Sequence, residues 1–400
     1  MMNGYPSQPQ LKRLPSHWRA GSRQVFLVAM LLVGNASTLW AIEKIELSQE
    51  GKNIVLSGRV LVEGQDGSLL FQSRDGVIHV ISKDEVKQRS SESRPFEPLS
   101  QDAFGRQLLD SLPGGFQLQT TDHFVIGYNT SEAYARWCGN LLERLYRAFF
   151  AFWEKREFEL KPPEFPLAVL IFEDQADYVA YSRSELGAAA EAVIGYYNFR
   201  TNQMVMFDLT GLAQANRTQR RRYSSSQIRQ LLSQPASERN VATMIHEATH
   251  QLAYNTGLQT RYAGNPFWVA EGLAVYFESP DLRNTTGWRT IGRVNRFRLQ
   301  EFTRQLPTRS PNRLAQLVAD DALFRNSGTA SAAYADAWGL NYYLFRKKPK
   351  DYVAYLTELS KMSPLQAPSA EDRLEQFRRF FGSDLERLDK NMTAYLRRIR

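Results

Sequence analysis

Apolar and polar residues alternate with a period of two along residues 43–87, which predicts a small antiparallel β meander. Asp66-Gly67 and Asp75-Gly76 interrupt the alternation, as turns between neighbouring strands do. The segment is short and carries no set of metal ligands. We therefore interpret it as an accessory barrel, in which His79 is a residue of the strand surface. Residues 88–112 begin with a stretch rich in Lys, Arg, Ser, Glu and Pro and are predicted to form a linker.

The pattern changes after residue 112. Strands are expected at 116–128 and 167–172, helices at 131–156 and 174–185, and a hairpin at 194–199 and 204–207. After a helix around residue 245 the pattern is helical to the end, with blocks near 266–278, 291–305, 311–319, 331–346, 350–361, 370–381 and 384–399. Strands followed by a long helical region are typical of an α+β protein.

The first 41 residues resemble an export segment. Basic residues precede the apolar run 25–33, and small residues follow it up to Ala41. Cleavage after Ala36 or Ala41 would release a mature protein, whereas an uncleaved stretch from Val25 to Ile42 would serve as a membrane anchor. Both alternatives export residues 43–400, so the expected location is periplasmic, cell-surface or secreted, with membrane contact only if the segment stays uncleaved.

Composition supports a globular exported chain, with 43% hydrophobic and 12% aromatic residues among 400. The formal net charge of +8 falls to +4 when the four basic residues of 1–41 are removed. Arginines gather in the Ser- and Gln-rich stretch 217–239, which is either a solvated loop or a contact for anionic wall polymer or lipid. No motif supports nucleic-acid binding. The single cysteine, Cys138, lies in an aromatic helical pattern and is expected to be an inert core thiol.

The motif His246-Glu247-Ala248-Thr249-His250 carries the main chemical prediction. Ser237 is a candidate N-cap, Gly257 a candidate terminator, and apolar residues between them recur at helical spacing. On a helix, His246 and His250 project from one face and can reach one tetrahedral ion. Glu247 lies at the edge of that face, where it can act on a water molecule without ligating the metal.

A second helix is predicted to begin at Asn265-Pro266 and to carry Glu271 within Trp-Val-Ala-Glu-Gly-Leu-Ala-Val-Tyr. Apolar neighbours surround Glu271, and a buried carboxylate needs a cation or several donors. The alternative is a carboxylate on the helix surface. Glu278 lies on the same helical face and either accepts the N–H of a ligand histidine or is a solvated charge at the helix end.

The sequences His-Glu-Ala-Thr-His-Gln and Trp-Val-Ala-Glu-Gly-Leu-Ala-Val-Tyr-Phe-Glu resemble those of the gluzincin metallopeptidases. They are most similar to the peptidase MA-like branch, which includes secreted bacterial proteins of a domain family of unknown function. The resemblance runs from about residue 113 to 400, with specific motifs at 240–280 and weaker ones at 331–345. Thermolysin and the aminopeptidases place the glutamate one or two residues closer to the second histidine, a departure that concerns the loop 257–266.

The resemblance implies that zinc is held by His246, His250 and Glu271, with Glu247 as the general base. It also implies a zincin-like α+β lobe and a C-terminal helical lobe, with the zinc at the floor of the cleft between them. Because gluzincins commonly bring a Tyr or His from the helical lobe to the oxyanion, Tyr334 is the candidate for this role. Tyr276 is the competing candidate.

The expected function is that of an exported zinc-dependent peptidase acting on a peptide or protein substrate. Strand 204–207 or 196–199 would pair with an extended peptide, unless the two form a plain core hairpin. One alternative is a non-catalytic cell-envelope module, in which zinc stabilises the fold and the β meander with the arginine stretch binds a wall or protein partner. Glu247 argues against it, since a structural zinc site needs no base. A third interpretation is hydrolysis of another amide, such as a wall cross-link.

Overall fold

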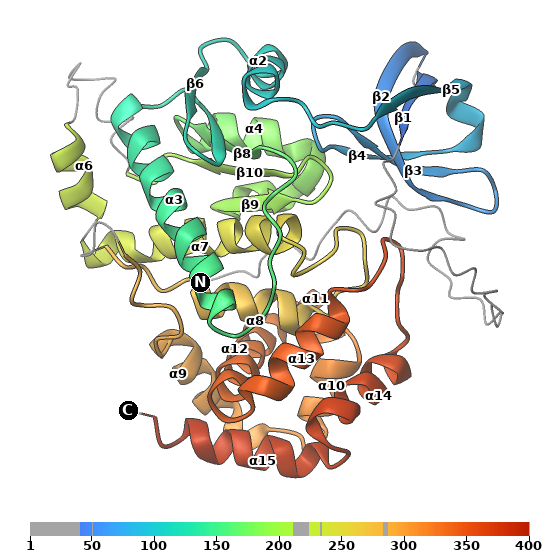
Figure 1. Ribbon diagram of the computed structural model, residues 1–400. Helices are drawn as coiled ribbons and strands as arrows, with labels where there is room; N and C mark the ends of the chain where they lie inside the picture. Colours follow the sequence, from blue (N-terminus) through green and yellow to red (C-terminus); the bar gives the residue numbers. More distant parts are fainter. Residues whose placement is uncertain (1–40, 50, 211–223, 233, 283–286, 400) are drawn as a thin grey trace.

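The computed structural model describes residues 41–49, 51–210, 224–232, 234–282 and 287–399. Its architecture is α+β, as predicted: an N-terminal antiparallel sheet, a second mixed sheet and a helical C-terminal region (Figure 1). Residues 1–40 of the proposed export segment lie outside the described residues, as does the part of the arginine-rich stretch from 217 to 223, which holds Arg217, Arg220, Arg221 and Arg222. Within the part of the chain that the structure describes, no helix is long and apolar enough to cross a membrane.

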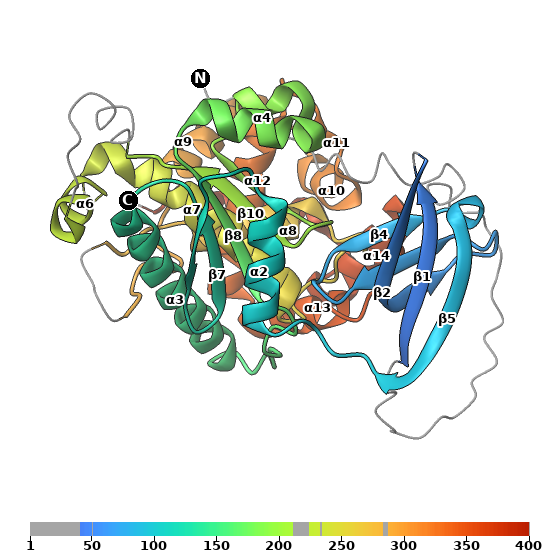
Figure 2. The same ribbon diagram turned by 90° about the horizontal axis from the view of Figure 1, so that it is seen from above.

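The first sheet is a five-stranded antiparallel meander in the order β4-β3-β2-β1-β5. Its strands are β1 (Ala41–Gln49), β2 (Lys52–Glu63), β3 (Leu69–Ser73), β4 (Ile78–Ile81) and β5 (Val86–Pro95). Ile45, Phe71 and Ile81 are buried in its small core. The sheet stands beside the main body of the protein (Figure 2).

The linker prediction for residues 88–112 is wrong. Val86–Pro95 forms strand β5, which pairs with β1 at one edge of the sheet. Most of its side chains are exposed, so an edge strand here tolerates the polar composition that favoured a linker. Helix α2 (Gln101–Ser111) follows, capped by the Ser100 hydroxyl, which accepts the N–H of Ala103.

Hydrogen bonds to backbone carbonyls attach the first sheet to the rest of the protein. The Ile78 N–H donates to the Arg200 carbonyl at 2.8 Å, and the Arg261 guanidinium donates to the Gly76 carbonyl at 2.9 Å. His79 is half-buried, not fully on the surface: its Nε2 lies 3.2 Å from the Ser73 hydroxyl, and burial lowers its pKa. The first sheet is therefore docked on the second sheet's hairpin region.

The second sheet has the order β6-β7-β8-β10-β9. Its strands are β6 (Gln117–Thr120), β7 (Phe124–Tyr128), β8 (Leu167–Phe172), β9 (Gly195–Asn198) and β10 (Gln203–Phe207). The central three strands are parallel, while β6 and β9 run antiparallel at the edges. The single strand predicted at 116–128 is a hairpin, because a turn in which the Thr121 N–H donates to the Phe124 carbonyl divides it.

Alternate residues of the central strands face two different layers. Val125, Leu170 and Val205 pack with α2 and with α4 (Gln175–Leu186) on one face. Residues such as Ile126 and Val169 pack on the other face with α3 (Glu132–Glu154) and α7 (Pro235–Asn255). Cys138 is fully buried on α3, and burial raises the pKa of its thiol, as expected for an inert core residue.

Helix α7 lies between the second sheet and the helical region (Figure 1). It begins at Pro235, so Ser237 is not its N-cap; the Ser237 hydroxyl instead donates to the Leu231 carbonyl of α6 (Ser225–Leu232). Gly257 follows its C-terminus with a positive φ of 81°, as predicted.

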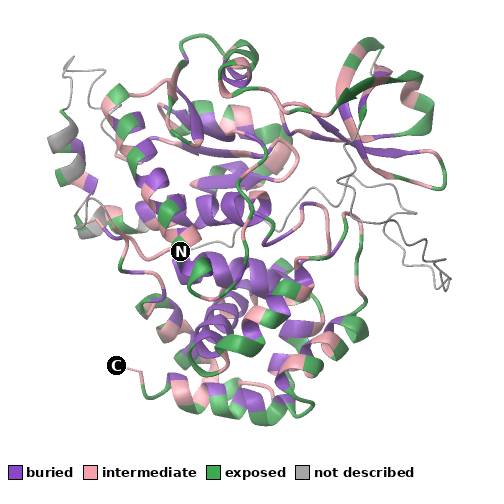
Figure 3. Ribbon diagram, in the orientation of Figure 1, coloured by how far each residue is buried: buried purple, intermediate pink, exposed green. Residues whose placement is uncertain are grey.

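The helical region contains α8 (Phe267–Phe277), α9 (Arg296–Gln305), α10 (Arg313–Ala319), α11 (Ala322–Arg325), α12 (Ala330–Lys347), α13 (Pro349–Leu359), α14 (Ala370–Phe381) and α15 (Leu385–Leu396). Helix α12 crosses α8 and α9 at the centre of this region. The three helices α7, α8 and α12 are among the most consistently buried elements of the protein (Figure 3).

Candidate metal centre

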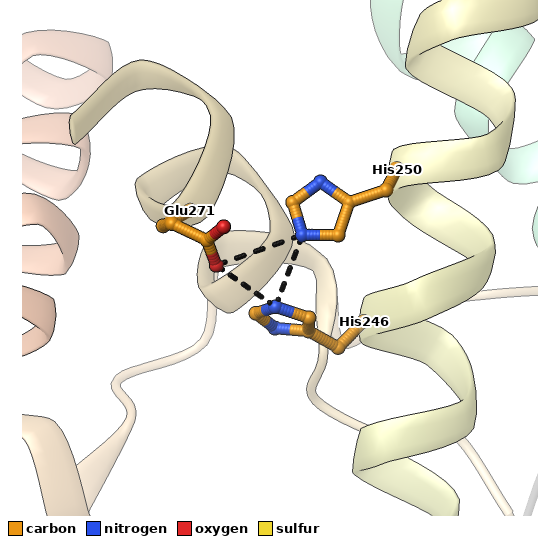
Figure 4. Close-up of side chains that lie close together, drawn as sticks. All are labelled: His246, His250 and Glu271. Carbon is orange, nitrogen blue, oxygen red and sulfur yellow. Dashed lines mark hydrogen bonds and ion pairs between the residues drawn. The ribbon is translucent and has the colours of Figure 1, made fainter. Parts of the chain in front are cut away.

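Helices α7 and α8 bring His246, His250 and Glu271 together (Figure 4). The Nε2 atoms of the two histidines lie 3.2 Å apart, and the Glu271 Oε2 lies 3.2 Å from Nε2 of His246 and 3.6 Å from Nε2 of His250. All three residues are buried. Among the described residues, this is the group of His, Cys, Asp and Glu side chains whose geometry could hold a metal ion.

The spacing of these three atoms fits a tetrahedral site. Zinc bonds to histidine nitrogen and carboxylate oxygen at about 2.1 Å, so the ligand atoms of a tetrahedral zinc lie about 3.4 Å apart. The observed separations of 3.2, 3.2 and 3.6 Å are close to that value. Two imidazoles and one carboxylate are also a donor set that suits zinc. The residues present could therefore hold a metal ion.

Helix α7 is held against the sheet by apolar packing and by one buried amide. Ile245, Ala248 and Leu252 are fully buried in the core below the sheet. The Gln251 side chain donates to the Ala168 carbonyl of β8 at 2.9 Å and to the Asn202 carbonyl at 3.0 Å. These contacts fix the rotation of α7 and with it the direction in which both histidines project.

The position of helix α8 is fixed by a close contact with α12 at Gly272, the residue after Glu271. A Cβ at this position would overlap the Asn341 side-chain nitrogen and lie 2.7 Å from the Ala337 carbonyl oxygen. The Asn341 amide donates to the Trp268 carbonyl at 2.9 Å and to the Ala337 carbonyl at 2.8 Å, and its oxygen accepts from the Tyr352 hydroxyl. Only glycine permits this contact, which sets the distance of Glu271 from α7.

Glu278 orients one of the histidines. Its Oε2 lies 3.1 Å from Nδ1 of His246, and its Oε1 accepts a hydrogen bond from the Asn295 amide at 2.6 Å. A carboxylate bonded to the outer nitrogen of a histidine fixes the ring orientation and makes the inner nitrogen a better ligand. Of the two alternatives for Glu278, the structure therefore favours the histidine partner over the solvated charge.

Glu247 lies beside the cluster and is hydrogen-bonded to the second sheet. Its Oε2 accepts the backbone N–H of Tyr197 at 2.8 Å, from the edge strand β9. Burial raises the pKa of Glu247, and the nearby Glu271 charge adds to this effect while the two histidines oppose it. A raised pKa suits a carboxylate that must accept a proton near neutral pH.

His246 and Glu271 stabilise each other's charged forms. Burial opposes the charged form of His246, but hydrogen bonds to Glu271 and Glu278 outweigh it and raise the pKa of His246 to about 10. Burial also opposes ionisation of Glu271, yet the two histidines hold its pKa well below the usual range. The metal-free cluster is thus an ion pair, and a metal must displace the proton of His246 to bind there.

Tyr334 lies on α12 and is buried, with its ring edge against Phe324 and the Arg298 guanidinium 5.1 Å from its ring centroid. Its role at an oxyanion stays a prediction. Tyr276 packs in an aromatic group with Phe152 and Phe345, and its hydroxyl lies against Gly292. This contact uses a different side of α8 from Glu271.

The two predicted hairpin strands have different surroundings. Strand β10 is internal, flanked by β8 and β9, so residues 204–207 have no edge to offer a peptide. Strand β9 is the edge, and α7 packs directly against it.

Sequence reasoning missed Gly272, Gln251, Asn295 and Asn341, which position the site without belonging to it. The only hint was the dipeptide Glu271-Gly272, since a glycine inside a buried helix is costly unless another backbone approaches it. Asn295 and Asn341 lie far along the chain from the residues that they support. No local pattern distinguishes them from ordinary polar residues.

Comparison with known sequence families matches residues 240–366 to a family described as "Protein of unknown function (DUF1570)". The matched segment contains the HExxH motif, Glu271, Glu278 and Tyr334. No curated protein matches the chain. The family description assigns no activity, so a function has to be argued from the site itself.

Proposed function

We propose that the protein is an exported zinc-dependent peptidase. The observation that carries this proposal is the position of Glu247: a buried carboxylate next to three atoms spaced for a tetrahedral metal, yet outside the ligand set itself. A site that serves only to stabilise a fold gains nothing from such a residue. The resemblance to gluzincins around residues 240–280 and the apolar segment near the N-terminus support the same conclusion.

His246, His250 and Glu271 would hold the zinc, and Glu278 would orient His246 through its Nδ1. Zinc would supply Lewis acidity at the scissile carbonyl and lower the pKa of the attacking water. Glu247 would accept the proton of that water and deliver it to the leaving amine. The N–H of Tyr197 fixes Oε2 of Glu247, which leaves Oε1 as the oxygen for proton transfer.

Strand β9 would position an extended peptide, because it is the edge of the sheet and its backbone already contacts Glu247. Tyr334 would stabilise the oxyanion from the helical region. The role of β9 is supported by its packing against α7, and the role of Tyr334 rests on the resemblance.

The proposal is tested by zinc content and by cleavage of a peptide library with and without chelator. The purified protein should hold about one zinc per chain, and His250→Ala should abolish zinc binding. Glu247→Gln should retain zinc and fold but lose hydrolysis by several orders of magnitude, because it removes the base while preserving size. Glu375→Gln, an exposed position on α14, is the matched control and should behave like wild type.

A zinc-loaded protein that cleaves nothing in the library, and whose cellular role survives Glu247→Gln, would instead support the envelope-module alternative. Full zinc occupancy in His250→Ala would contradict the ligand assignment itself.

A further inference from the structure

A basic cavity lies on the far side of α8 from the metal ligands. It has a volume of about 530 Å³ and is formed by α3, the last turns of α8 and α12, and residues 287–291. Tyr276, whose hydroxyl lies against Gly292, contributes to its wall. The volume lies within the range of small-molecule binding sites.

Of the residues that the structure describes, six cationic side chains and no carboxylate line this cavity. They are Arg144, Arg147, Lys155, Arg156, Arg289 and Arg346. Among the described residues, none of the six forms a side-chain ion pair within 4.0 Å. The carboxylate of Asp281 lies nearby, where it accepts the backbone N–H of Arg289 and acts electrostatically on Arg144.

Two half-buried guanidiniums, those of Arg144 and Arg156, are held rigidly in this cavity. Arg144 donates from Nη2 to the Asp281 and Gly287 carbonyls and lies 5.3 Å from the ring centroid of Trp288. Arg156 donates to the Phe152 carbonyl at 2.8 Å and lies 3.5 Å from the centroid of the same residue's ring. Such guanidiniums are already ordered for a ligand, so binding costs little side-chain entropy.

Donor capacity remains after these contacts. The Nε of Arg144 and the Nε1 of Trp288 are buried and, among the described residues, have no hydrogen-bond partner. Burial lowers the pKa of both Arg144 and Arg156, and a neighbouring arginine lowers it further in each case. Because neighbouring guanidiniums repel one another, a bound anion relieves this repulsion and is held more strongly than by an isolated cation.

The partial negative charges at nearby helix C-termini do not neutralise the positive charge of this cavity. The ends of α3, α8 and α12 meet at the cavity, and each supplies about half a negative charge. Together with Asp281 they contribute about −2.5, against six cations, so an excess of more than three positive charges remains. Stabilisation of helix ends therefore explains only part of the cluster.

We propose that this cavity binds phosphate groups, supplied either by a soluble organic phosphate or by the headgroup of an anionic phospholipid. Phosphate carries up to two negative charges and several acceptor oxygens in a small volume, which suits several converging guanidinium forks. The aromatic wall beside the cations would accommodate the organic part of the ligand. This inference does not depend on the proposed peptidase activity.

The test compares two probes on the full chain. Inorganic pyrophosphate is titrated by calorimetry at about 0.15 M salt, where weak surface attraction is screened. Sedimentation with phosphatidylcholine vesicles, with and without phosphatidylglycerol, measures lipid binding. Binding to pyrophosphate points to a soluble ligand, and binding confined to the phosphatidylglycerol vesicles points to the lipid; either result supports the proposal if the variants below respond.

Arg144→Gln/Arg156→Gln should weaken binding at least about tenfold, since each lost charge-assisted hydrogen bond is worth a factor of that order. Arg147→Gln/Lys155→Gln removes two exposed charges and keeps the proposal testable if the first pair unfolds the protein. Arg183→Gln/Arg387→Gln is the charge-matched control, because both side chains are well exposed elsewhere.

His250→Ala should bind the probes as wild type does, which separates this cavity from the metal centre. The proposal is overturned if neither probe binds, if the control pair weakens binding as much as the cavity pairs do, or if pyrophosphate binding disappears in His250→Ala.

Discussion

Gly272→Ala is the sharpest test of how the fold positions the proposed metal ligands. The new methyl group would overlap the Asn341 amide nitrogen and approach the Ala337 carbonyl oxygen to 2.7 Å. Asn341 has no room to retreat, because it is buried and donates to both the Trp268 and Ala337 carbonyls. Helices α8 and α12 must therefore separate, and Asn341 then loses its hydrogen bond to the Trp268 carbonyl of α8.

The expected destabilisation follows from three contributions. Overpacking of a tight core costs about 1–3 kcal/mol, and loss of a buried hydrogen bond by Asn341 adds about 1–3 kcal/mol for the group left unsatisfied. Alanine recovers up to about 1 kcal/mol, since it favours the helix over glycine. We expect Gly272→Ala to lower the free energy of unfolding by about 1–5 kcal/mol.

Gly105→Ala is the matched control. Gly105 is also buried within a helix, but the atom nearest to the place that a new methyl group would occupy is the flexible Leu118 Cδ1, at 3.3 Å. The same propensity gain applies there without a backbone or amide clash, so its stability should be unchanged or slightly higher. Urea unfolding of the metal-free proteins measures both changes, and a zinc titration measures the displacement of Glu271. A Gly272→Ala protein with wild-type stability and zinc affinity would refute the proposed role of the α8–α12 contact.

Three further outcomes follow from the site. Glu278→Gln should weaken zinc binding by about 10- to 100-fold with the fold intact, measured by competition with a chromogenic chelator; unchanged affinity would remove Glu278 from the site. In metal-free protein the raised pKa of His246 stabilises the fold fully below pH about 6.5, and this contribution is lost as pH rises toward about 10, so urea midpoints should fall across that window unless zinc is bound. Tyr334→Phe should lower turnover by about 10²–10³ with zinc content unchanged, and wild-type turnover would return Tyr334 to a packing role.

The sequence predicted those features that depend on local periodicity. Histidines four apart on a helix share a face whatever the rest of the fold does, so the spacing of His246 and His250 is enough to pair them. The strand at 167–172 and the final helices could be predicted equally well, because each buries a continuous or periodic series of apolar residues. Strand β5 was missed because an exposed edge strand carries no such set.

The remaining parts of the site depend on contacts between distant segments. Asn295 reaches Glu278, and Asn341 reaches Trp268 across 73 residues, by way of elements whose relative placement no local pattern encodes. Ser237 is a case in which a local signal was misleading. Its side chain could cap a helix, but the helix already begins at Pro235, two residues earlier.

These long-range contacts explain why the HExxH motif is needed for the candidate metal centre but does not form it alone. Helix α7 carries two of the proposed ligands and the proposed base, but the third proposed ligand lies on α8, whose distance from α7 is set by a glycine that lets α12 approach. The same helix α8 ends at Glu278, which completes the orientation of His246. A chain that kept the HExxH motif but replaced Gly272 or Glu278 would still present two histidines on one face. We expect it to bind metal weakly, because a tetrahedral site requires all of its ligand atoms to lie about 3.4 Å from one another at the same time.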